Sequence, residues 1–423
     1  MNTVNSLFDF IEKSPTALHA TATVKDRLLA EGYTELYEGD TAPLAAGKYF
    51  VTRNGSSIIA FRTGGAERGF MICASHSDSP AFRVKQNGEK NNAYARLDVE
   101  KYGGMIYYSW LDRPLSVAGR AVVRTESGLR TELVNIDCDL ATIPSLAIHL
   151  NRKVNDGLTL NPATDMLPVY SIGAPRGICE MVAERLGVTA DRVVSHDLFL
   201  YVRERGRLIG EDEALILCPR LDDLECVFSS LEAFLGAKDS DSVPVLAVFD
   251  NEEVGSATKQ GAASTFLSDT LMRVAGGSDR YSAMLNNSFM VSADNAHALH
   301  PNHPEMSDKE NAPVIGGGIA VKLNASQRYA TDGVSFAVFS LICERAGAKT
   351  QTYYNRADLP GGSTLGSISN TCVSVPTVDI GLPQLAMHSA TETAGASDLD
   401  DMIKALTEFY STSLIRRGDR IDF

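Results

Sequence analysis

Two adjacent glutamates, Glu252 and Glu253, follow directly after an apolar run and are the residues of this chain best placed to do chemistry. The run Val243–Phe249 predicts a buried strand, and Asp250 and Asn251 separate it from the glutamates. Burying two carboxylates is costly unless a cation neutralises them, and a metal ion or a substrate amine is the usual cation. A Glu-Glu pair on a solvated turn is also ordinary, so the rest of the chain must decide between the two readings.

Four further segments carry histidine and carboxylate side chains next to predicted elements. They are Ser75–Pro80 with His76 and Asp78, Arg220–Leu224 with Asp222 and Asp223, Ser292–Asn302 with Asp294, and Met387–Ser389 with His388. Taken singly, each segment also has a structural explanation, because acidic residues at a helix start cap the helix and interact favourably with its dipole. Taken together, they converge on the edge where an α/β sheet places its site, at the carboxyl ends of the strands.

A mixed set of imidazole and carboxylate ligands suits zinc, or manganese and cobalt by substitution, and does not suggest a thiolate site. The candidates exceed the three protein ligands of a single catalytic zinc, which allows two metals about 3.5 to 4 Å apart that share one carboxylate. We assign one metal to His76, Asp222 and Asp294, and the other to His388, Asp222 and Glu253. This division leaves Glu252 as an unligated general base, although composition does not decide which of the two glutamates is left over.

The elements around these segments predict an α/β protein with a β-rich insert. Helical and buried-strand patterns alternate before residue 84 and after residue 218, which favours a mostly parallel sheet flanked by helices. Short β-like runs, among them Met105–Trp110, dominate the middle of the chain, where Ile178–Leu186 is the one clear helix. We therefore expect a catalytic domain in two parts, 1–84 and 218–423, and an inserted β-rich domain at 85–217.

Composition limits the classes of partner. The net charge of −14, from 39 basic and 53 acidic residues, argues against non-specific binding to nucleic acid. No apolar stretch reaches the roughly 18 residues of a membrane span, and the N-terminus lacks the features of a secretory signal. Seven cysteines without a CxxC pair suit a reducing cytoplasm and structural roles. We expect a cytoplasmic protein with no nucleic-acid or membrane partner.

The segments can also be compared as motifs. In chain order they read His-Ser-Asp-Ser-Pro at 76–80, Arg-Leu-Asp-Asp-Leu at 220–224, Phe-Asp-Asn-Glu-Glu-Val-Gly-Ser at 249–256, Ser-Ala-Asp-Asn-Ala-His-Ala-Leu-His-Pro-Asn at 292–302 and Gln-Leu-Ala-Met-His-Ser at 384–389. Together they resemble the aspartyl aminopeptidase family of co-catalytic zinc metallopeptidases. The resemblance covers nearly the whole chain and includes the segments 147–152 and 322–329.

The resemblance implies two zinc ions per subunit. The residues that match the family's zinc ligands are His76, Asp222, Glu253, Asp294 and His388, with Asp222 as the bridge. Asp78 matches the acid that supports the first histidine, and Glu252 matches the general base. Many members have asparagine where this chain has Asp223, which makes Asp223 an alternative candidate for the bridging role.

The resemblance also implies activity and assembly. Members combine a zinc-exopeptidase-like α/β domain with a β-rich dimerisation domain, remove the N-terminal residue from peptides with free N-termini, and form tetrahedral dodecamers from six dimers. His149 matches a histidine that a neighbouring subunit sends into the active site to hold substrate. A preference for N-terminal Asp or Glu requires a cation in the substrate pocket, for which Lys322 and Arg356 are the candidates.

Two other classes of function remain as alternatives. A two-metal hydrolase of a non-peptide amide, such as a deacylase, could use the same ligands, but the match outside the ligands argues against it. A non-catalytic relative would be expected to lack Glu252 or a ligand, and none is missing.

Overall fold

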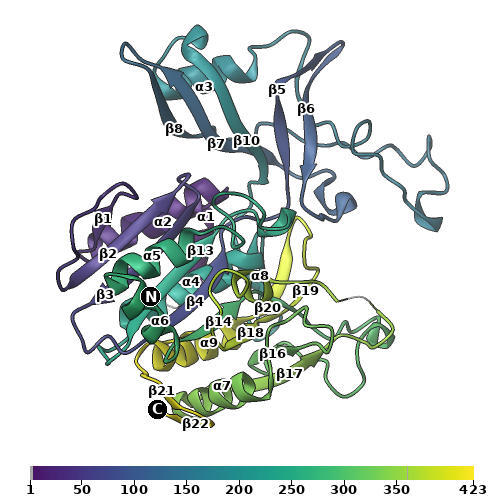
Figure 1. The fold of residues 1–423 in the computed structure, drawn as a ribbon. Coiled ribbons are helices and arrows are strands. Elements are labelled where there is room, and N and C mark those ends of the chain that lie inside the picture. Colours follow the sequence, from purple (N-terminus) through teal and green to yellow (C-terminus); the bar gives the residue numbers. More distant parts are fainter. Residues whose placement is uncertain (1–2, 360) are drawn as a thin grey trace. The chain divides into compact units, whose positions relative to one another are not determined.

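The computed structural model describes residues 3–359 and 361–423 and divides into two compact units (Figure 1). The first unit contains the chain up to Asp78, then Gly206–Met387 and Glu392–Phe423, and the second contains Ser79–Arg205 and His388–Thr391. Residues 206–217, which we expected in the insert, therefore belong to the first unit. Within the described residues, no helix is both long enough and apolar enough to cross a membrane.

A nine-stranded sheet forms the centre of the first unit, in the order β1-β2-β3-β13-β4-β14-β18-β16-β17. The strands are β1 (Thr34–Leu36), β2 (Gly47–Arg53), β3 (Ser57–Thr63), β4 (Phe70–His76), β13 (Val243–Phe249), β14 (Phe289–Ala293), β16 (Ile319–Leu323), β17 (Thr350–Tyr354) and β18 (Thr377–Gly381). The four central strands, β13, β4, β14 and β18, are parallel to one another. β3 and β16, on either side of them, run antiparallel to β13 and β18. The mostly parallel sheet that the sequence predicted is thus confirmed.

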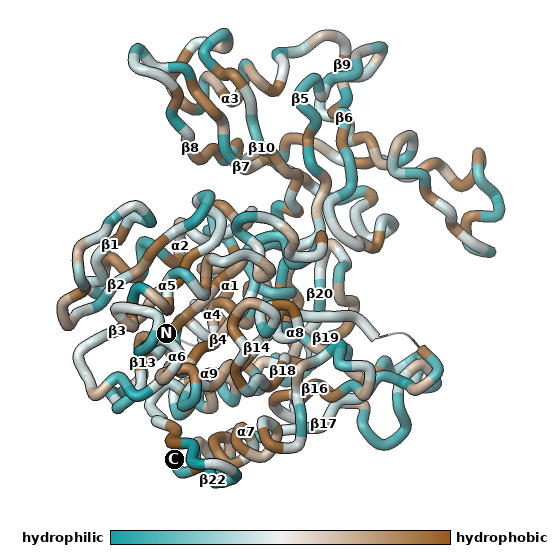
Figure 2. The backbone as a smooth tube through the Cα atoms, viewed as in Figure 1, coloured by the Kyte–Doolittle hydropathy of each residue, from teal (hydrophilic) through white to brown (hydrophobic). Residues whose placement is uncertain are grey.

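Helices cover both faces of this sheet because its strands are apolar on both sides. Met71 and Cys73 of β4 face one hydrophobic core, and Phe70 and Ile72 face the other. The first core packs against α1 (Thr3–Glu12), α2 (Ala17–Ala30), α4 (Leu221–Gly236), α7 (Gly333–Ala346) and α9 (Ala396–Tyr410). The second core packs against α5 (Phe266–Ala275), α6 (Ser278–Leu285) and α8 (Leu365–Ser369). Figure 2 shows the hydrophobic colouring concentrated along central elements such as β4 and β14.

A smaller sheet lies beside the central one in the first unit, in the order β11-β12-β20-β19-β15. Its strands are β11 (Arg207–Ile209), β12 (Leu215–Cys218), β15 (Ala296–His297), β19 (Pro383–Leu385) and β20 (Glu392–Gly395). Because β12 leads into α4 and β15 follows β14, this sheet supports the turns from which Asp222 and Asp294 project. The first unit ends in a hairpin of β21 (Ile415–Arg417) and β22 (Arg420–Asp422).

The second unit is an antiparallel sheet in the order β8-β7-β10-β5-β6-β9 with one α-helix, α3 (Ile178–Leu186). The strands are β5 (Ala81–Asn91), β6 (Tyr94–Tyr102), β7 (Leu115–Arg124), β8 (Leu129–Asn135), β9 (Val169–Ile172) and β10 (Val193–Val202). The strand predicted at Met105–Trp110 is wrong, because Tyr107–Trp110 forms a 3₁₀ turn. In that turn the Ser109 hydroxyl donates to Ile106 O, and the Trp110 ring packs edge-on against Phe82.

Candidate metal centre

The candidate metal ligands and the candidate base of the first unit lie together at one edge of the central sheet. His76 is the last residue of β4, Glu252 and Glu253 form a 3₁₀ turn after β13, and Asp294 follows β14. Since these three strands are adjacent and parallel, their carboxyl ends meet. Asp222 reaches the same edge from the first turn of α4. This helix follows β12, which belongs to the smaller sheet.

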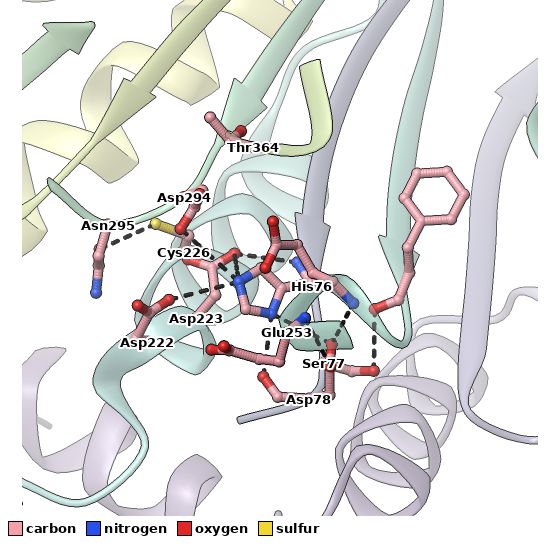
Figure 3. A network of polar contacts seen from close by, with 12 residues as sticks. His76, Ser77, Asp78, Asp222, Asp223, Cys226, Glu253, Asp294, Asn295 and Thr364 are labelled. Carbon is pink, nitrogen blue, oxygen red and sulfur yellow. Dashed lines mark hydrogen bonds and ion pairs between the residues drawn. The ribbon is translucent and has the colours of Figure 1, made fainter. Parts of the chain in front are cut away.

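The imidazole of His76 is buried and oriented by contacts on both sides (Figure 3). Its Nδ1 lies 3.0 Å from the backbone oxygen of Asp78 and 3.3 Å from Asp78 Oδ1. Its Nε2 lies 3.4 Å from Asp222 Oδ1 and 3.7 Å from Asp294 Oδ1. A proton held on Nδ1 by Asp78 directs the Nε2 lone pair toward the two other carboxylates, which is the tautomer that a metal ligand requires.

These spacings fit a zinc ion. Nitrogen and oxygen ligands about 2.0 to 2.1 Å from a tetrahedral zinc lie about 3.3 Å from one another. The distances from His76 Nε2 to Asp222 and Asp294 are close to this value. His76, Asp222, Asp223 and Asp294 each offer one ligand atom within 4.8 Å of the others, and so do His76, Glu252 and Glu253. The donor set of imidazole and carboxylates is the one that zinc accepts.

The electrostatics show that the chain's own cations do not neutralise this cluster. Burial raises the pKa of Glu252 to about 8; the charge of His76 lowers this pKa, and the charges of Asp294, Glu253 and Asp78 raise it. Burial and the same kind of repulsion raise the pKa of Asp223 well above its usual range. These carboxyl groups keep protons because burial disfavours their charged forms, and a divalent cation would remove that penalty.

Two cations among the described residues contact the cluster, His76 and Lys322. Burial by itself lowers the pKa of His76, but the surrounding carboxylates, Asp223 first, raise it well above the usual value. Lys322 is also buried, with its Nζ 3.5 Å from Asp294 Oδ2. Burial lowers the pKa of this ammonium, but the charge of Asp294 raises it further and keeps the group charged.

Asp78 joins His76 to the glutamate turn. Its Oδ1 accepts a hydrogen bond from Glu252 N at 3.1 Å, and its Oδ2 accepts one from Glu253 N at 3.2 Å. The carboxylate that faces His76 Nδ1 therefore also fixes the backbone of both glutamates. One residue sets the orientation of a metal ligand and of the candidate base.

Asp223 is engaged in a different way from Asp222. Its Oδ2 accepts a hydrogen bond from the backbone nitrogen of His76 at 3.0 Å, and its side chain is fully buried. The distance from His76 Nε2 to Asp223 is 4.0 Å, against 3.4 Å to Asp222. This geometry favours Asp222 over Asp223 as the ligand on the imidazole side.

Three further residues were predicted for the site: His388, His149 and Arg356. His388 belongs to the second unit, where its Nδ1 lies 2.9 Å from the backbone oxygen of Gly104, so the Nε2 of this tautomer carries the lone pair. His149 lies in an exposed turn of the second unit. Arg356, in the first unit, pairs with Asp358 through two contacts of 2.7 Å.

Several residues of the site were missed by the sequence analysis. Glu392 in β20 accepts a hydrogen bond from Asp222 N at 3.0 Å. Asn295 and Glu225 form a buried polar network behind the ligands. Asn295 lies inside the motif at 292–302, and its position directly after Asp294 was the one sign in the sequence that it belongs to the site. Nothing in the sequence pattern points to Glu392, which is distant along the chain from Asp222.

Comparison with known proteins identifies the family of this chain. Residues 10–410 match the protein family described as aminopeptidase I zinc metalloprotease (M18). The chain belongs to the M18 family of zinc aminopeptidases. The aspartyl aminopeptidase resemblance is thereby confirmed, and the M18 chain is a metalloaminopeptidase, a hydrolase of peptide bonds.

Relatives of similar length support the assignment. The chain is 44% identical to a probable M18 family aminopeptidase 2 of Clostridium acetobutylicum, with 96% of this chain and 98% of the relative covered. It is 40% identical to one from Pseudomonas aeruginosa, with 96% and 97% covered. A chain in the cryo-EM structure of the Ape4 and Nbr1 complex superposes with a TM-score of 0.92 at 33% identity, covering 97% of this M18 chain and 85% of that one. The S. cerevisiae mApe1 dodecamer superposes at 0.84 and 27%, with 96% and 95% covered.

A pH-dependent stability follows from the buried Glu225. Burial, together with the nearby charge of Asp398, raises the pKa of this carboxyl group from 4.5 to about 8. The folded protein therefore holds a proton that the unfolded chain has released, and stability is lost as the pH rises from about 4.5 through 8. Glu225→Gln removes this titration, so its unfolding free energy should gain on the wild type by about 1.4 kcal/mol per pH unit across that window.

Urea denaturation of the metal-free protein at pH 5, 7 and 9 measures this difference. Glu232→Gln, on a more exposed position of the same helix, controls for the substitution itself. A Glu225→Gln advantage that stays constant from pH 5 to 9 would contradict the burial argument.

Proposed function

We propose that this M18 chain is a di-zinc aminopeptidase that hydrolyses the N-terminal residue from peptides and prefers acidic N-terminal residues. The observation that carries the proposal is the spacing of His76, Asp222 and Asp294 beside the Glu252–Glu253 turn. That arrangement supplies three ligands for one metal. Next to them lies Glu252, a carboxylate that is not one of these three ligands.

The residues divide into metal ligands and a base. His76, Asp222 and Asp294 would hold one zinc, and Asp222, Glu253 and His388 the other, with manganese or cobalt as substitutes. When bound, the zinc ions polarise the scissile carbonyl and make water more acidic. Glu252 accepts the proton of the attacking water and delivers it to the leaving amine.

Two features support a preference for peptides with acidic N-termini. The carboxylates of the centre would attract the free α-amino group, which limits cleavage to the chain end. A pocket of about 350 Å³ in the same unit is lined by Arg356, His297, His300 and Tyr353, among others. Arg356 offers a guanidinium that could exchange Asp358 for a substrate carboxylate. Lys322 instead contributes positive charge at Asp294.

Features of the second unit support assembly into dimers and a tetrahedral dodecamer, with His149 acting across the subunit boundary. Leu146, Ile148 and Leu150, next to His149, are 60%, 52% and 75% exposed. Adjacent apolar side chains that face solvent commonly mark a protein interface. A similar structure, mApe1, is a dodecamer.

We also propose that the enzyme works in the cytoplasm, without nucleic-acid or membrane partners. The net charge of −14 and seven free cysteines support this placement.

The proposal is tested with chelated protein, before and after zinc is restored, on p-nitroanilides of Asp, Glu, Ala, Leu and Lys. We expect no release without metal, and release after zinc is restored with the highest kcat/KM for Asp and Glu. Arg356→Gln should lower kcat/KM for the Asp substrate at least about tenfold, roughly 1.4 kcal/mol, and leave the Leu substrate unchanged. Zinc-dependent release that favours neutral residues would overturn the acidic preference, and no release from any substrate would favour the deacylase alternative.

The role of His149 is tested by mixing two inactive variants. His149→Phe and Glu252→Gln subunits are each expected to lose most activity as homo-oligomers. If His149 serves a neighbouring active site, co-expressed subunits regain activity, because an intact Glu252 site receives His149 from a Glu252→Gln neighbour. Mixed oligomers that stay as inactive as either parent would contradict action across subunits, and His149→Phe with the wild-type rate would exclude the residue from function.

A further inference from the structure

A buried polar network lies behind the metal centre, and the amide of Asn295 is at its middle. Asn295 is 2% exposed. Its Nδ2 donates to the backbone oxygen of Leu221 and to Gln384 Oε1, both at 3.1 Å, and lies 3.4 Å from Glu225 Oε2. Its Oδ1 accepts from Cys226 Sγ at 3.2 Å (Figure 3). An amide has two N–H hydrogens, so the two shorter contacts are its principal donated hydrogen bonds.

The position of Asn295 connects the two carboxylates that face His76. Asn295 directly follows Asp294 at the end of β14, and Leu221 directly precedes Asp222 at the start of α4. The hydrogen bond to Leu221 O therefore joins the backbones next to two ligands on different elements. The bond to Gln384 anchors the same amide to β19 of the smaller sheet.

We propose that Asn295 is a positioning residue that fixes the spacing of the Asp222 and Asp294 carboxylates and thereby sets the zinc affinity of the site that includes His76. The inference rests on the proposed function for the identity of the metal, and it is independent of the substrate. Asn295 adds no charge to the cluster, and its amide is engaged by Leu221 O, Gln384 Oε1 and Cys226 Sγ. Its contribution to metal binding is therefore geometric.

Removal of the amide has a defined consequence. Leu221 O and Gln384 Oε1 are acceptors in a buried region, and without Asn295 they lose this donor. The first turn of α4 must then shift to find another partner, and Asp222 shifts with it relative to Asp294. Substitutions that remove such supporting hydrogen bonds behind metal ligands typically weaken metal affinity 10- to 100-fold.

Asn287 provides a control at the opposite end of the same strand, β14. It precedes β14, whereas Asn295 follows it, so the two residues lie at opposite ends of the strand. Its side chain also joins separate segments, with Nδ2 3.3 Å from Arg68 O and Oδ1 accepting from Arg416 N at 2.9 Å. Loss of Asn287 removes comparable hydrogen bonds without disturbing the metal-binding edge.

The experiment measures the zinc Kd of the full-length chelated protein by competition with a chromogenic chelator. We expect Asn295→Ala and Asn295→Leu to weaken zinc binding at the site that includes His76 by about 10- to 100-fold and Asn287→Ala to stay within about twofold of the wild type. The leucine variant preserves volume and guards against collapse of the alanine variant, and the thermal midpoint of each metal-free protein reports folding.

Wild-type zinc affinity in both Asn295 variants would overturn the inference and leave the proposed function standing, as would an equal loss in Asn287→Ala. A wild-type protein that binds no zinc would overturn the proposed function and this inference with it.

Discussion

The properties of the candidate metal centre follow from one constraint, which is the electrostatic cost of burying several carboxylates together at one edge of a sheet. Asp222, Asp223 and Asp294 surround His76, and Lys322 adds a second cation beside Asp294. In a buried site this excess of acids raises carboxyl pKa values, which means that the charged forms are unstable without a counterion. A divalent cation would relieve that cost, so the same feature that destabilises the cluster of carboxylates would give it affinity for such a cation.

The fold holds this cluster by a rigid frame. Parallel strands buried between two hydrophobic cores bring His76, Asp294 and the glutamate turn to one edge, and α4 supplies Asp222. Hydrogen bonds to the backbone then hold two of these segments: Asp78 accepts from both nitrogens of the glutamate turn, and Asn295 donates to Leu221 O at the start of α4. These contacts therefore position the elements that carry the candidate ligands and the candidate base.

Local patterns predicted much of this architecture, and contacts between distant segments account for what they missed. The strand Val243–Phe249 was predicted with the bounds that the structure has, because it is an apolar run that acidic residues follow directly. The 3₁₀ turn at Tyr107–Trp110 was predicted as a strand, because aromatic β-propensity does not reveal that Trp110 packs against Phe82. Glu392 reaches Asp222 from 170 residues away, which no spacing rule encodes. Sequence also could not say which of the paired glutamates binds metal.

Zinc content measured beside turnover in Glu252→Gln and Glu253→Gln tests the central claim most directly. If Glu253 is a ligand and Glu252 the base, Glu252→Gln retains two zinc ions per subunit and loses roughly 100- to 10,000-fold in kcat, the range for loss of a general base. Glu253→Gln then loses about one of its zinc ions. Loss of zinc from Glu252→Gln, with full zinc in Glu253→Gln, would contradict the division of roles at this centre.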